Sequence, residues 1–581
     1  MHSFFKKGLT SFRSSILLQL FLLIIFIVPS FSSLLRAGYF SMQDDQQAFR
    51  LHQMVKCLED RQLPCRWIPD GGYGYGYPMF NYYPPSLYYL GAVLKISGFQ
   101  IIDTVKLLFI LGFIASGVTM FFLLRDFFGL LPAYTGSLLY VYAPFRAVEV
   151  YVRGALSESW ALALFPLLFL YSFRAVKNGQ RSNYLFLAIV ISLLLLTHIP
   201  MSVIFLPVLA VWIFALAIFF REFKRLPKFV ASFILAVGMA AFFIIPAIVE
   251  KGYVHTETLI GGYFDYRQHF VSLGGLFFSN RWGYGSSNLG QTDNLSLSVG
   301  IVHWIAALGA LVLALFSIKR NVFIAKLAIL LVGLALGILF MVHQKSSFIW
   351  ETINFLAYLQ FPWRFLGPAI FLLSFLAAVG IFLCPRGKFT LFATLFLLLA
   401  AWSLYGNFFK PKDWLRITDK EKLSGVIWEK QLTSSIFDYL PIYAQFPPTT
   451  KAPDYPEVLS GEAVIESYNK GSDFQEGVIL VKSAVKLRVP LYDFPGMSVY
   501  VDDSFVQHLN NDCSGLPFCL GLINFSIPNE GRHTIKIKLE NTPLRTFANI
   551  FTLLSFSSVI PILAVLMASE VKSSRGYAKS V

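Results

Sequence analysis

Residues 201–220 read MSVIFLPVLAVWIFALAIFF and contain no charged side chain. A helix needs about 20 consecutive apolar residues to cross the hydrocarbon core of a bilayer, so this stretch predicts a membrane span. Similar apolar runs recur along the whole chain. We expect about twelve spans in total, at roughly residues 14–35, 102–124, 131–148, 158–175, 184–199, 201–220, 229–249, 297–318, 322–342, 364–384, 389–409 and 546–568.

The composition indicates a polytopic α-helical membrane protein. Of the 581 residues, 56% are apolar and 14% are charged, whereas soluble domains have roughly 45–50% and about 25%. The mean hydropathy is +0.61. These values exclude a soluble protein, a disordered chain and a small disulfide-rich domain. The formal net charge is +15, but the basic residues stand between apolar runs. Membrane topology explains them better than nucleic-acid binding, and no nucleic-acid partner is expected.

Short basic segments stay on the cytoplasmic side of a membrane. Every second connection is basic, which predicts that both ends of the chain are cytoplasmic. The first apolar run also fits a cleaved signal peptide, because its basic start is typical of one. The large segments 36–101, 250–296 and 410–545 then lie on the outer side. The basic residues are Lys6, Lys7, Arg13, Arg125, Arg174, Lys177, Arg181, Arg221, Lys224, Arg225, Lys228, Lys319, Arg320, Arg386, Lys388, Lys572, Arg575 and Lys579.

The cysteines provide an independent test of this topology. Cys57 and Cys65 lie close together in one outer segment, and Cys513 and Cys519 in another, whereas Cys384 stands alone at a cytoplasmic end. Two close pairs outside and a single thiol inside are typical of an oxidising outer compartment, so each pair is a disulfide candidate. Free thiols at chance spacing are the alternative. A zinc site is disfavoured because neither pair has CxxC spacing or an adjacent histidine.

The last outer segment, 410–545, changes to a period of two. Such alternation, with turn residues between the runs, predicts antiparallel strands. Asp502–Asp503 is the expected hairpin turn. We expect a small all-β domain of the sandwich or jelly-roll kind, acting as a lid, a scaffold or an acceptor-recognition module. The alternating residues are Val478, Leu480, Lys482, Val485, Leu487 and Val489, and then Ile535, Ile537 and Leu539.

The first outer segment, 36–101, contains adjacent carboxylates at Asp44 and Asp45. Apolar residues at helical spacing follow, so an amphipathic helix is expected to start near Asp44. An ionised carboxylate at a helix N-terminus can take a proton from an attacking hydroxyl. Two adjacent carboxylates can also hold a divalent cation. The structural alternative is simple N-capping, for which aspartate is a preferred residue.

The same segment continues with a Gly- and Pro-rich stretch that carries Tyr75, Tyr77 and Tyr83. Tyrosines in such a loop can stack on sugar rings, which makes them candidate substrate-binding residues. Tyrosine is also enriched at membrane–water interfaces for purely structural reasons. Residues 85–99 are too short to span and predict an interfacial or re-entrant helix.

A second group of charged residues joins two predicted spans on the outer side. Arg146 and Arg153 oppose the positive-inside bias there, next to Glu149 and Glu158. Guanidinium groups suit phosphate oxygens, so the arginines are candidate phosphate ligands. Glu158 is also a candidate substrate-binding residue. Salt bridges with the two glutamates are the structural alternative.

Two further residues stand at outer ends of predicted spans. Arg364 follows Trp363 and is either a ligand for a lipid phosphate or part of an interfacial anchor. His198 lies at a helix junction, where local hydrogen bonding competes with a role in substrate binding. Other candidates for the same cavity are Arg267, His269, Arg281, Trp282 and Tyr284.

Together these motifs resemble the GT-C superfamily of polytopic glycosyltransferases. Their order is most similar to one bacterial and archaeal branch, the membrane proteins related to 6-pyruvoyl-tetrahydropterin synthase. The run 492–502 followed by a last span resembles the C-terminal module of YfhO-type relatives. The stretches that carry the resemblance are Asp44–Asp45 with 66–85, then 143–158, 197–200 and 360–364.

This resemblance implies an inverting glycosyltransferase of the plasma (inner) membrane, with its active site on the extracytoplasmic face. The donor would be a polyprenyl-phosphate sugar, and the acceptor a glycan, lipid or protein of the cell envelope. Asp44 or Asp45 would be the catalytic base, and Arg146, Arg153 and Arg364 would bind the donor phosphate. Gln43 stands where many members of the branch have histidine. Which aspartate is the base, and whether a divalent metal ion takes part, are left open.

Two other functions fit the same basic outer rim. One is a flippase or exporter of a lipid-linked saccharide, and the other is a non-catalytic envelope assembly protein. The expected domains are a GT-C-like membrane domain over 1–409, an extracytoplasmic β-sandwich-like domain over 410–545, and a final span with a cytoplasmic tail over 546–581. The spans hold few ionisable groups away from their ends, which disfavours an ion-coupled transporter.

Overall fold

A computed structural model describes residues 15–287, 294–385 and 387–578, with side chains described up to residue 561. Lys6, Lys7, Arg13, Arg386 and Lys579, which contribute to the predicted orientation, lie outside the described residues, as do the side chains of Lys572 and Arg575.

The chain forms two compact units, each assembled from separate stretches of sequence. Unit 1 comprises residues 1–45, 105–236 and 263–416, and unit 2 comprises 46–104, 237–262 and 417–581. The expected division at residues 409 and 545 stays a prediction.

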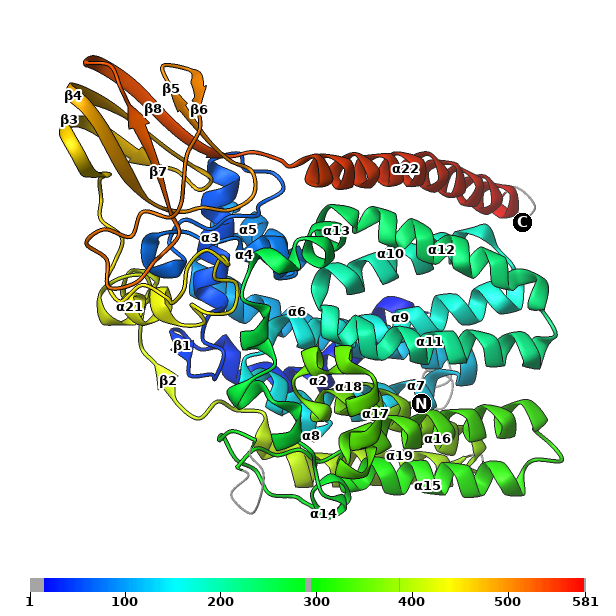
Figure 1. Ribbon diagram of the computed structural model, residues 1–581. Coiled ribbons are helices and arrows are strands. Elements are labelled where there is room, and N and C mark those ends of the chain that lie inside the picture. Colours follow the sequence, from blue (N-terminus) through cyan, green and yellow to red (C-terminus); the bar gives the residue numbers. More distant parts are fainter. Residues whose placement is uncertain (1–14, 288–293, 386, 579–581) are drawn as a thin grey trace. The chain divides into compact units, whose positions relative to one another are not determined.

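Unit 1 is helical, and its long helices run side by side (Figure 1). A two-residue pairing of β1 with β2 joins the stretch before Asp44 to the end of the unit. The elements are α2 Ile16–Phe31, β1 Tyr39–Phe40, α6 Ile101–Phe128, α7 Leu130–Val141, α8 Pro144–Ala147, α9 Leu156–Asn178, α10 Arg181–Thr197, α11 Ile199–Phe220, α12 Leu226–Met239, α14 Leu273–Phe277, α15 Ile301–Phe316, α16 Val322–Val342, α17 Ser347–Thr352, α18 Leu366–Leu383, α19 Lys388–Tyr405 and β2 Trp414–Leu415, with α6 and α12 continuing past the limits of the unit.

Each predicted span coincides with a helix. Among the described residues, 7 helices are long and apolar enough to cross a membrane, or up to 8 if the bent pair of α12 and α13 (Ala241–Val249) is one span. The shorter apolar helices α7, α10 and α15 coincide with three more of the predicted runs. The polytopic helical class is therefore confirmed, whereas the count of about twelve spans stays a prediction.

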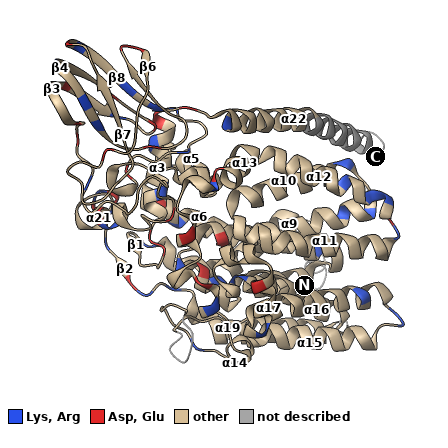
Figure 2. Ribbon diagram, viewed as in Figure 1, with Lys and Arg blue, Asp and Glu red and all other residues tan. Residues whose placement is uncertain are grey.

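The charges of unit 1 are distributed as the sequence predicts for one side of a membrane. Figure 2 shows Lys and Arg at one end of its helices, at the turns that join α9 to α10, α11 to α12 and α15 to α16. Arg174 there forms an ion pair with Asp126 at 3.0 Å. That this end is the cytoplasmic one stays a prediction.

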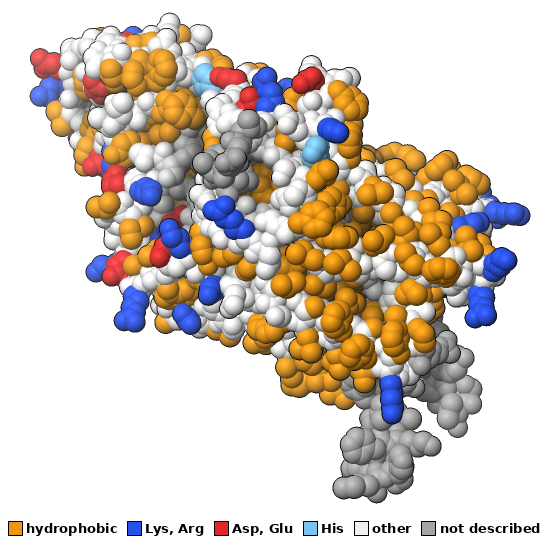
Figure 3. All heavy atoms as spheres, turned by 90° about the horizontal axis from the view of Figure 1, so that it is seen from below, with side chains coloured by type: hydrophobic (Ala, Val, Ile, Leu, Met, Phe, Trp, Pro, Cys, Tyr) orange, Lys and Arg blue, Asp and Glu red, His pale blue; other side chains and the backbone are white. Residues whose placement is uncertain are grey.

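Helix α18 lies at the centre of unit 1 and packs against α7, α9, α15 and α16. Its side chains are buried on all faces from Leu366 to Ile381, which explains why its sequence is apolar all round. Helices at the periphery of unit 1 instead carry exposed apolar side chains. Leu308 on α15 and Phe392 and Leu399 on α19 are exposed, and Figure 3 shows apolar side chains covering the helical surface, as contact with lipid tails requires.

Unit 2 contains residues 46–101 of the first outer segment, the short α13 and an all-β region followed by a long helix. The elements are α3 Gln47–Glu59, α4 Met79–Tyr82, α5 Ser86–Ile96, α13 Ala241–Val249, α20 Asp419–Lys422, α21 Gly425–Thr433, β3 Glu457–Lys470, β4 Phe474–Tyr492, β5 Met497–Val501, β6 Ser504–Val506, β7 Leu522–Ile527, β8 Gly531–Leu539 and α22 Pro543–Ala578.

The strands form one antiparallel sheet in the order β3-β4-β8-β5-β6, with β7 pairing the second half of β4. The all-β region is thus confirmed, but strand pairing unites its strands in a single six-stranded sheet. Asp502 and Asp503 have φ of 48° and 60°. These values fit the hairpin turn predicted between β5 and β6.

The buried face of this sheet differs in part from the sequence expectation. Val485, Leu487 and Val489 are buried, as are Ile535, Ile537 and Leu539. In the first half of β4, however, the buried residues are Ile479 and Val481, while Leu480 is 37% exposed. The alternation at Val478, Leu480 and Lys482 therefore marks the open face, because odd-numbered residues face the core of β4 up to Leu487.

Both predicted disulfides are present in unit 2, Cys57–Cys65 and Cys513–Cys519, and Cys384 is free. A buried ionic network lies in the same unit. Arg545 donates from Nε to Glu250 at 3.0 Å, and Asn81 donates to the same carboxylate oxygen at 2.9 Å.

Candidate functional site

Backbone hydrogen bonds fix the position of the two aspartates in unit 1. β1 pairs with β2, and the chain then runs along the end of the π-helix Val148–Arg153. The amide of Gln43 donates to the carbonyl of Val152, and the amide of Asp44 donates to the carbonyl of Arg153, both at 2.9 Å. Residues far apart in sequence are thereby brought together, as the predicted site requires.

Gly154 makes this close approach possible. Its φ is +67°, and a Cβ atom there would collide with the side chain of Met42, two residues before Asp44. Only glycine combines that backbone conformation with that space. The pair Met42–Gly154 therefore sets how closely the aspartate segment lies against the arginine segment.

The N-capping interpretation of the aspartates is wrong. α3 begins at Gln47, three residues later than expected near Asp44, and Gln46 occupies its N-cap position. Both aspartates are half-buried and precede the helix. Burial raises the pKa of the Tyr39 phenol well above its ordinary value, and the charges of Asp45 and Asp44 raise it further. Both carboxylates thus lie within electrostatic range of that phenol.

The charged residues at the outer junctions form one buried cluster, hereafter the quartet: Glu149, Arg153, Glu158 and Arg364. Nη1 of Arg153 lies 2.5 Å from Glu149 and 2.7 Å from Glu158. Nε of Arg364 lies 3.4 Å from the same Glu158 oxygen. The salt bridges expected as the structural alternative are therefore present for Arg153.

The cations of the quartet are its more exposed members. Arg153 is 12% and Arg364 9% exposed at the side chain, against 0% for Glu149 and 1% for Glu158. Arg153 uses only Nη1 for both carboxylates, and among the described residues its Nε and Nη2 have no hydrogen-bond partner. Unused guanidinium donors at the outer side of an ion cluster are suited to binding an anion.

Burial raises the pKa of Glu149 to about 8, against the opposing effect of Arg153. Glu149 is then largely protonated at neutral pH. The two arginines and ionised Glu158 leave the quartet with a net positive charge, which favours a phosphate over a neutral ligand.

His198 lies beside the quartet and has a structural role as well. Its Nε2 is 3.9 Å from Glu158, while its Nδ1 accepts a hydrogen bond from the amide of Met201 at 3.1 Å. The ring therefore caps the N-terminus of α11, which confirms local hydrogen bonding without testing a role in substrate binding.

Arg146 lies deeper and apart from the quartet. It is fully buried, and donates to the Ser159 carbonyl at 3.0 Å and to the Ser116 hydroxyl at 2.8 Å. These contacts join three helical segments of unit 1. They give Arg146 a structural role, and its assignment to the donor phosphate stays a prediction.

The sequence interpretation missed Ser287. Its hydroxyl lies 2.8 Å from Nδ1 of His269 and accepts from Nε1 of Trp363 at 3.1 Å. The guanidinium of Arg153 lies over the Trp363 ring, 4.4 Å from its centroid. The second outer segment therefore supports the quartet through one indole ring, and a lone serine in a loop carries no pattern that would reveal this.

The same segment also contacts the residue before Asp44. The side chain of Gln43 donates to the carbonyl of Gly285 at 2.9 Å, and Tyr284 donates to the carbonyl of Lys410 at 3.0 Å. Residues 282–287 thus touch both the aspartate segment and the tryptophan that supports Arg153. His269, Trp282 and Tyr284, the further candidates of this segment, therefore lie near these contacts. Arg267 is exposed and pairs with Asp265.

The predicted tyrosines all belong to unit 2. Tyr75 is buried against Tyr492, with ring centroids 5.5 Å apart. Tyr77 is 5% exposed, and Tyr83 packs under the guanidinium of Arg50. Tyr75 and Tyr77 thus have packing roles in the core of their own unit, and their binding of substrate stays a prediction.

Among the described residues, no group of three or more His, Cys, Asp or Glu side chains is arranged to hold a metal ion.

The chain can now be compared with known proteins. Residues 80–261 match the family model described as 6-pyruvoyl-tetrahydropterin synthase related domain; membrane protein. This match confirms the expected resemblance over that region, which includes the quartet residues Glu149, Arg153 and Glu158. The YfhO-type module stays a prediction. No curated protein is similar in sequence.

Solved structures with a similar fold include three membrane enzymes. Arabinofuranosyltransferase AftD from Mycobacteria is 15% identical. The matched region covers 68% of this chain and 27% of the AftD chain, with a TM-score of 0.42. The Archaeoglobus fulgidus oligosaccharyltransferase is 14% identical, with coverages of 74% and 61% and a TM-score of 0.40. ArnT from Cupriavidus metallidurans, bound to undecaprenyl phosphate, is 13% identical, with coverages of 61% and 58% and a TM-score of 0.38.

This chain thus spans between 27% and 61% of the length of those three proteins.

Proposed function

We propose that the protein is an inverting glycosyltransferase that moves a sugar from a polyprenyl-phosphate donor to an acceptor outside the cytoplasm. The observation that carries the proposal is the hydrogen bond from Asp44 to Arg153. It holds the backbone of the aspartate segment against the segment that carries Arg153, whose guanidinium belongs to the quartet. Sugar transfer from a phosphate needs a base for the acceptor and cations for the leaving group.

In this proposal Asp44 or Asp45 takes the proton of an acceptor hydroxyl. The acceptor oxygen forms a bond to the anomeric carbon from the face opposite the phosphate. The bond between that carbon and the phosphate oxygen breaks, and its electron pair leaves with polyprenyl phosphate. Arg153 and Arg364 stabilise the charge that develops on the leaving phosphate, since their side chains are more exposed than those of the two glutamates in the quartet.

The donor lipid is supported by the surroundings of the quartet. Arg364 lies in the short 3-10 helix Pro362–Phe365 that leads into α18, the buried central helix, and Arg153 precedes α9, another helix long and apolar enough to cross a membrane. Phosphate ligands at the ends of such helices suit a donor whose lipid tail stays in the bilayer.

The test uses the full chain in lipid nanodiscs, a panel of radiolabelled polyprenyl-phosphate sugars and an envelope extract as acceptor. Loss of the base should lower the transfer rate by about 10²–10⁴-fold. We expect this for Asp44→Asn or Asp45→Asn. Asp413→Asn is the matched control, because Asp413 is exposed and contacts Ser41 through its backbone. If both aspartate variants transfer sugar like the wild type, the proposal is wrong.

The phosphate role is tested separately by donor binding. Arg153→Gln and Arg364→Gln should raise the KM for the donor, while wild-type affinity for the acceptor is retained. Movement of the labelled lipid across the bilayer without loss of its sugar would instead support a flippase.

A further inference from the structure

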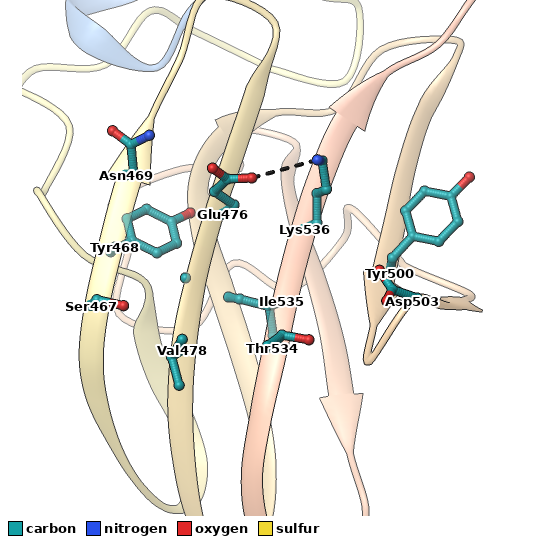
Figure 4. A pocket seen from close by; sticks show the side chains of 11 residues that line it. Ser467, Tyr468, Asn469, Glu476, Val478, Tyr500, Asp503, Thr534, Ile535 and Lys536 are labelled. Atoms are coloured by element: carbon teal, nitrogen blue, oxygen red, sulfur yellow. Dashed lines mark ion pairs between the residues drawn. The ribbon is translucent and has the colours of Figure 1, made fainter.

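The open face of the β sheet in unit 2 carries a groove of about 500 Å³ (Figure 4). Side chains from β3, β4, β8 and β5 line it. This volume lies within the ~300–1,000 Å³ range of small-molecule sites. The groove belongs entirely to unit 2 and shares no residue with the quartet.

Strand register shows why these side chains share one face. Asn469 pairs with Glu476, Glu476 with Lys536, and Lys536 with Tyr500. Tyr500 then pairs with Phe505 on the edge strand. Directly opposed residues in an antiparallel sheet point to the same side. One row across five strands therefore presents an amide, a carboxylate, an ammonium group and two aromatic rings.

The row is partly preorganised. Lys536 forms an ion pair with Glu476 at 3.5 Å (Figure 4), and its ammonium group lies 5.9 Å from the centroid of the Phe474 ring. Tyr500 donates to Glu540 at 3.1 Å, which fixes the ring. Polar groups held in place before binding lose less entropy when a ligand arrives.

Gly477 contributes to the shape of the groove. A Cβ atom at this position would collide with the carbonyl of Ser467 and lie 2.7 Å from a ring carbon of Tyr468. The ring of Tyr468 thus covers the glycine, and its hydroxyl donates to Gln475 at 2.6 Å. Tyr468 pairs with Gly477, so its ring lies on the opposite face of the sheet from Asn469 and Glu476, behind the floor of the groove.

We propose that this groove binds a neutral oligosaccharide. Sugars present many hydroxyl groups, which the amide of Asn469, the carboxylate of Glu476, the ammonium of Lys536 and the hydroxyl of Thr534 can all engage as donors or acceptors. Apolar faces of sugar rings pack on aromatic side chains, which Tyr500 supplies in the lining. The ring of Phe505 lies next to it, with centroids 6.2 Å apart.

The charges of the groove favour a neutral ligand. Its lining carries Glu476 and Asp503 against the single cation Lys536. A phosphate-rich or acidic polymer would meet a net negative lining. A peptide strand would add to a sheet edge by backbone hydrogen bonds, whereas this site is on the face of the sheet.

Glycan binding here is independent of the proposed sugar transfer, because it involves none of the residues assigned to that reaction. The test uses the full chain in nanodiscs with a panel of neutral tetrasaccharides, and measures binding by saturation-transfer NMR. Wild type should bind at least one of them at millimolar concentration. Lys536→Ala, Asn469→Ala and Tyr500→Ala should each weaken binding by about 3- to 10-fold, as expected for the loss of one or two modest contacts.

Lys482→Ala is the matched control, since Lys482 lies exposed on the same face of β4 but outside the groove. Asp44→Asn should also bind like the wild type, which separates this site from the transferase proposal. The inference is overturned if no neutral glycan binds at millimolar concentration, or if the three groove variants bind as tightly as the control.

Discussion

The backbone amide of Asp44 donates a hydrogen bond to the carbonyl of Arg153, with nitrogen and oxygen 2.9 Å apart. The side chain of Arg153 meanwhile pairs with Glu149 and Glu158. Arg153 therefore holds the backbone of the candidate base through its own carbonyl, and its side chain is itself the candidate phosphate ligand. Changes that shift this segment should affect both.

Gly154→Ala is expected to shift the segment that contains Asp44. The added methyl group would collide with the side chain of Met42 and displace the chain that leads to Asp44. We expect sugar transfer to fall by at least about tenfold, since small misplacements of reacting groups are costly. Gly129→Ala is the control, because Gly129 also has a positive φ but no atom within 4 Å of its Cβ position. Equal losses in both variants would show that backbone strain alone is responsible.

Trp363 should tune the affinity for the donor. Its ring lies under Arg153, and its N–H donates to Ser287. Replacement by leucine removes a cation–π contact worth about 0.5–2 kcal/mol, so donor affinity should fall by about 2- to 30-fold. Trp363→Phe keeps a ring and should lose less. Titration of the wild type and both variants with polyprenyl phosphate measures this, and a phenylalanine variant as weak as the leucine variant would contradict it.

Donor binding should depend on pH through Glu149. Its pKa is raised by burial to about 8, so it gains a negative charge as the pH rises through that value. The quartet then loses its net positive charge, and phosphate affinity should decline between about pH 7 and 9. Arg153, Glu158 and Arg364 are the charged groups that face it, and His198 lies beside Glu158.

Glu149→Gln is the matching variant, because it preserves shape and cannot ionise. Its donor affinity should stay level over the same pH range, and a decline as steep as in the wild type would assign the titration elsewhere. The raised pKa also means that the folded state holds this proton more tightly than the unfolded state. Its contribution to stability therefore falls as the pH rises from about 4.5 to 8.

The buried pair Arg545–Glu250 should matter for stability. Arg545 is 0% and Glu250 4% exposed at the side chain, so Arg545→Met leaves a buried carboxylate without its cation. The expected cost is about 3–5 kcal/mol. Arg532→Met, which removes a pair with the exposed Glu466, should cost at most about 1 kcal/mol. Thermal unfolding in nanodiscs compares them, and equal melting temperatures would contradict the expectation.

Local patterns predicted most of the fold. Hydropathy and basic connections are properties of short stretches, so the helices and their charged end follow from the sequence. The disulfide pairs and the Asp502–Asp503 turn follow for the same reason. The single sheet did not follow, because the pairing of β4 with both β8 and β7 depends on contacts between distant strands.

The site was predicted in part. Residue chemistry singled out Asp44, Arg153 and Arg364, which the fold places in one unit with the two glutamates. Arg146 and Tyr75 were candidates as well, but they are buried in packing roles. The sequence does not reveal this, because burial depends on the whole tertiary structure. Ser287 was missed because a hydroxyl that supports an indole ring has no sequence signature.

The length of β4 has a mechanical consequence. It pairs with β3 along almost its whole length, with β8 along its first half and with β7 along its second. Although its ladder with β3 is interrupted by four register shifts, β4 pairs in both halves of the sheet, so force applied to one half is carried to the other through this strand. The amide protons of the sheet should exchange with solvent together, in one slow cooperative event, and not strand by strand.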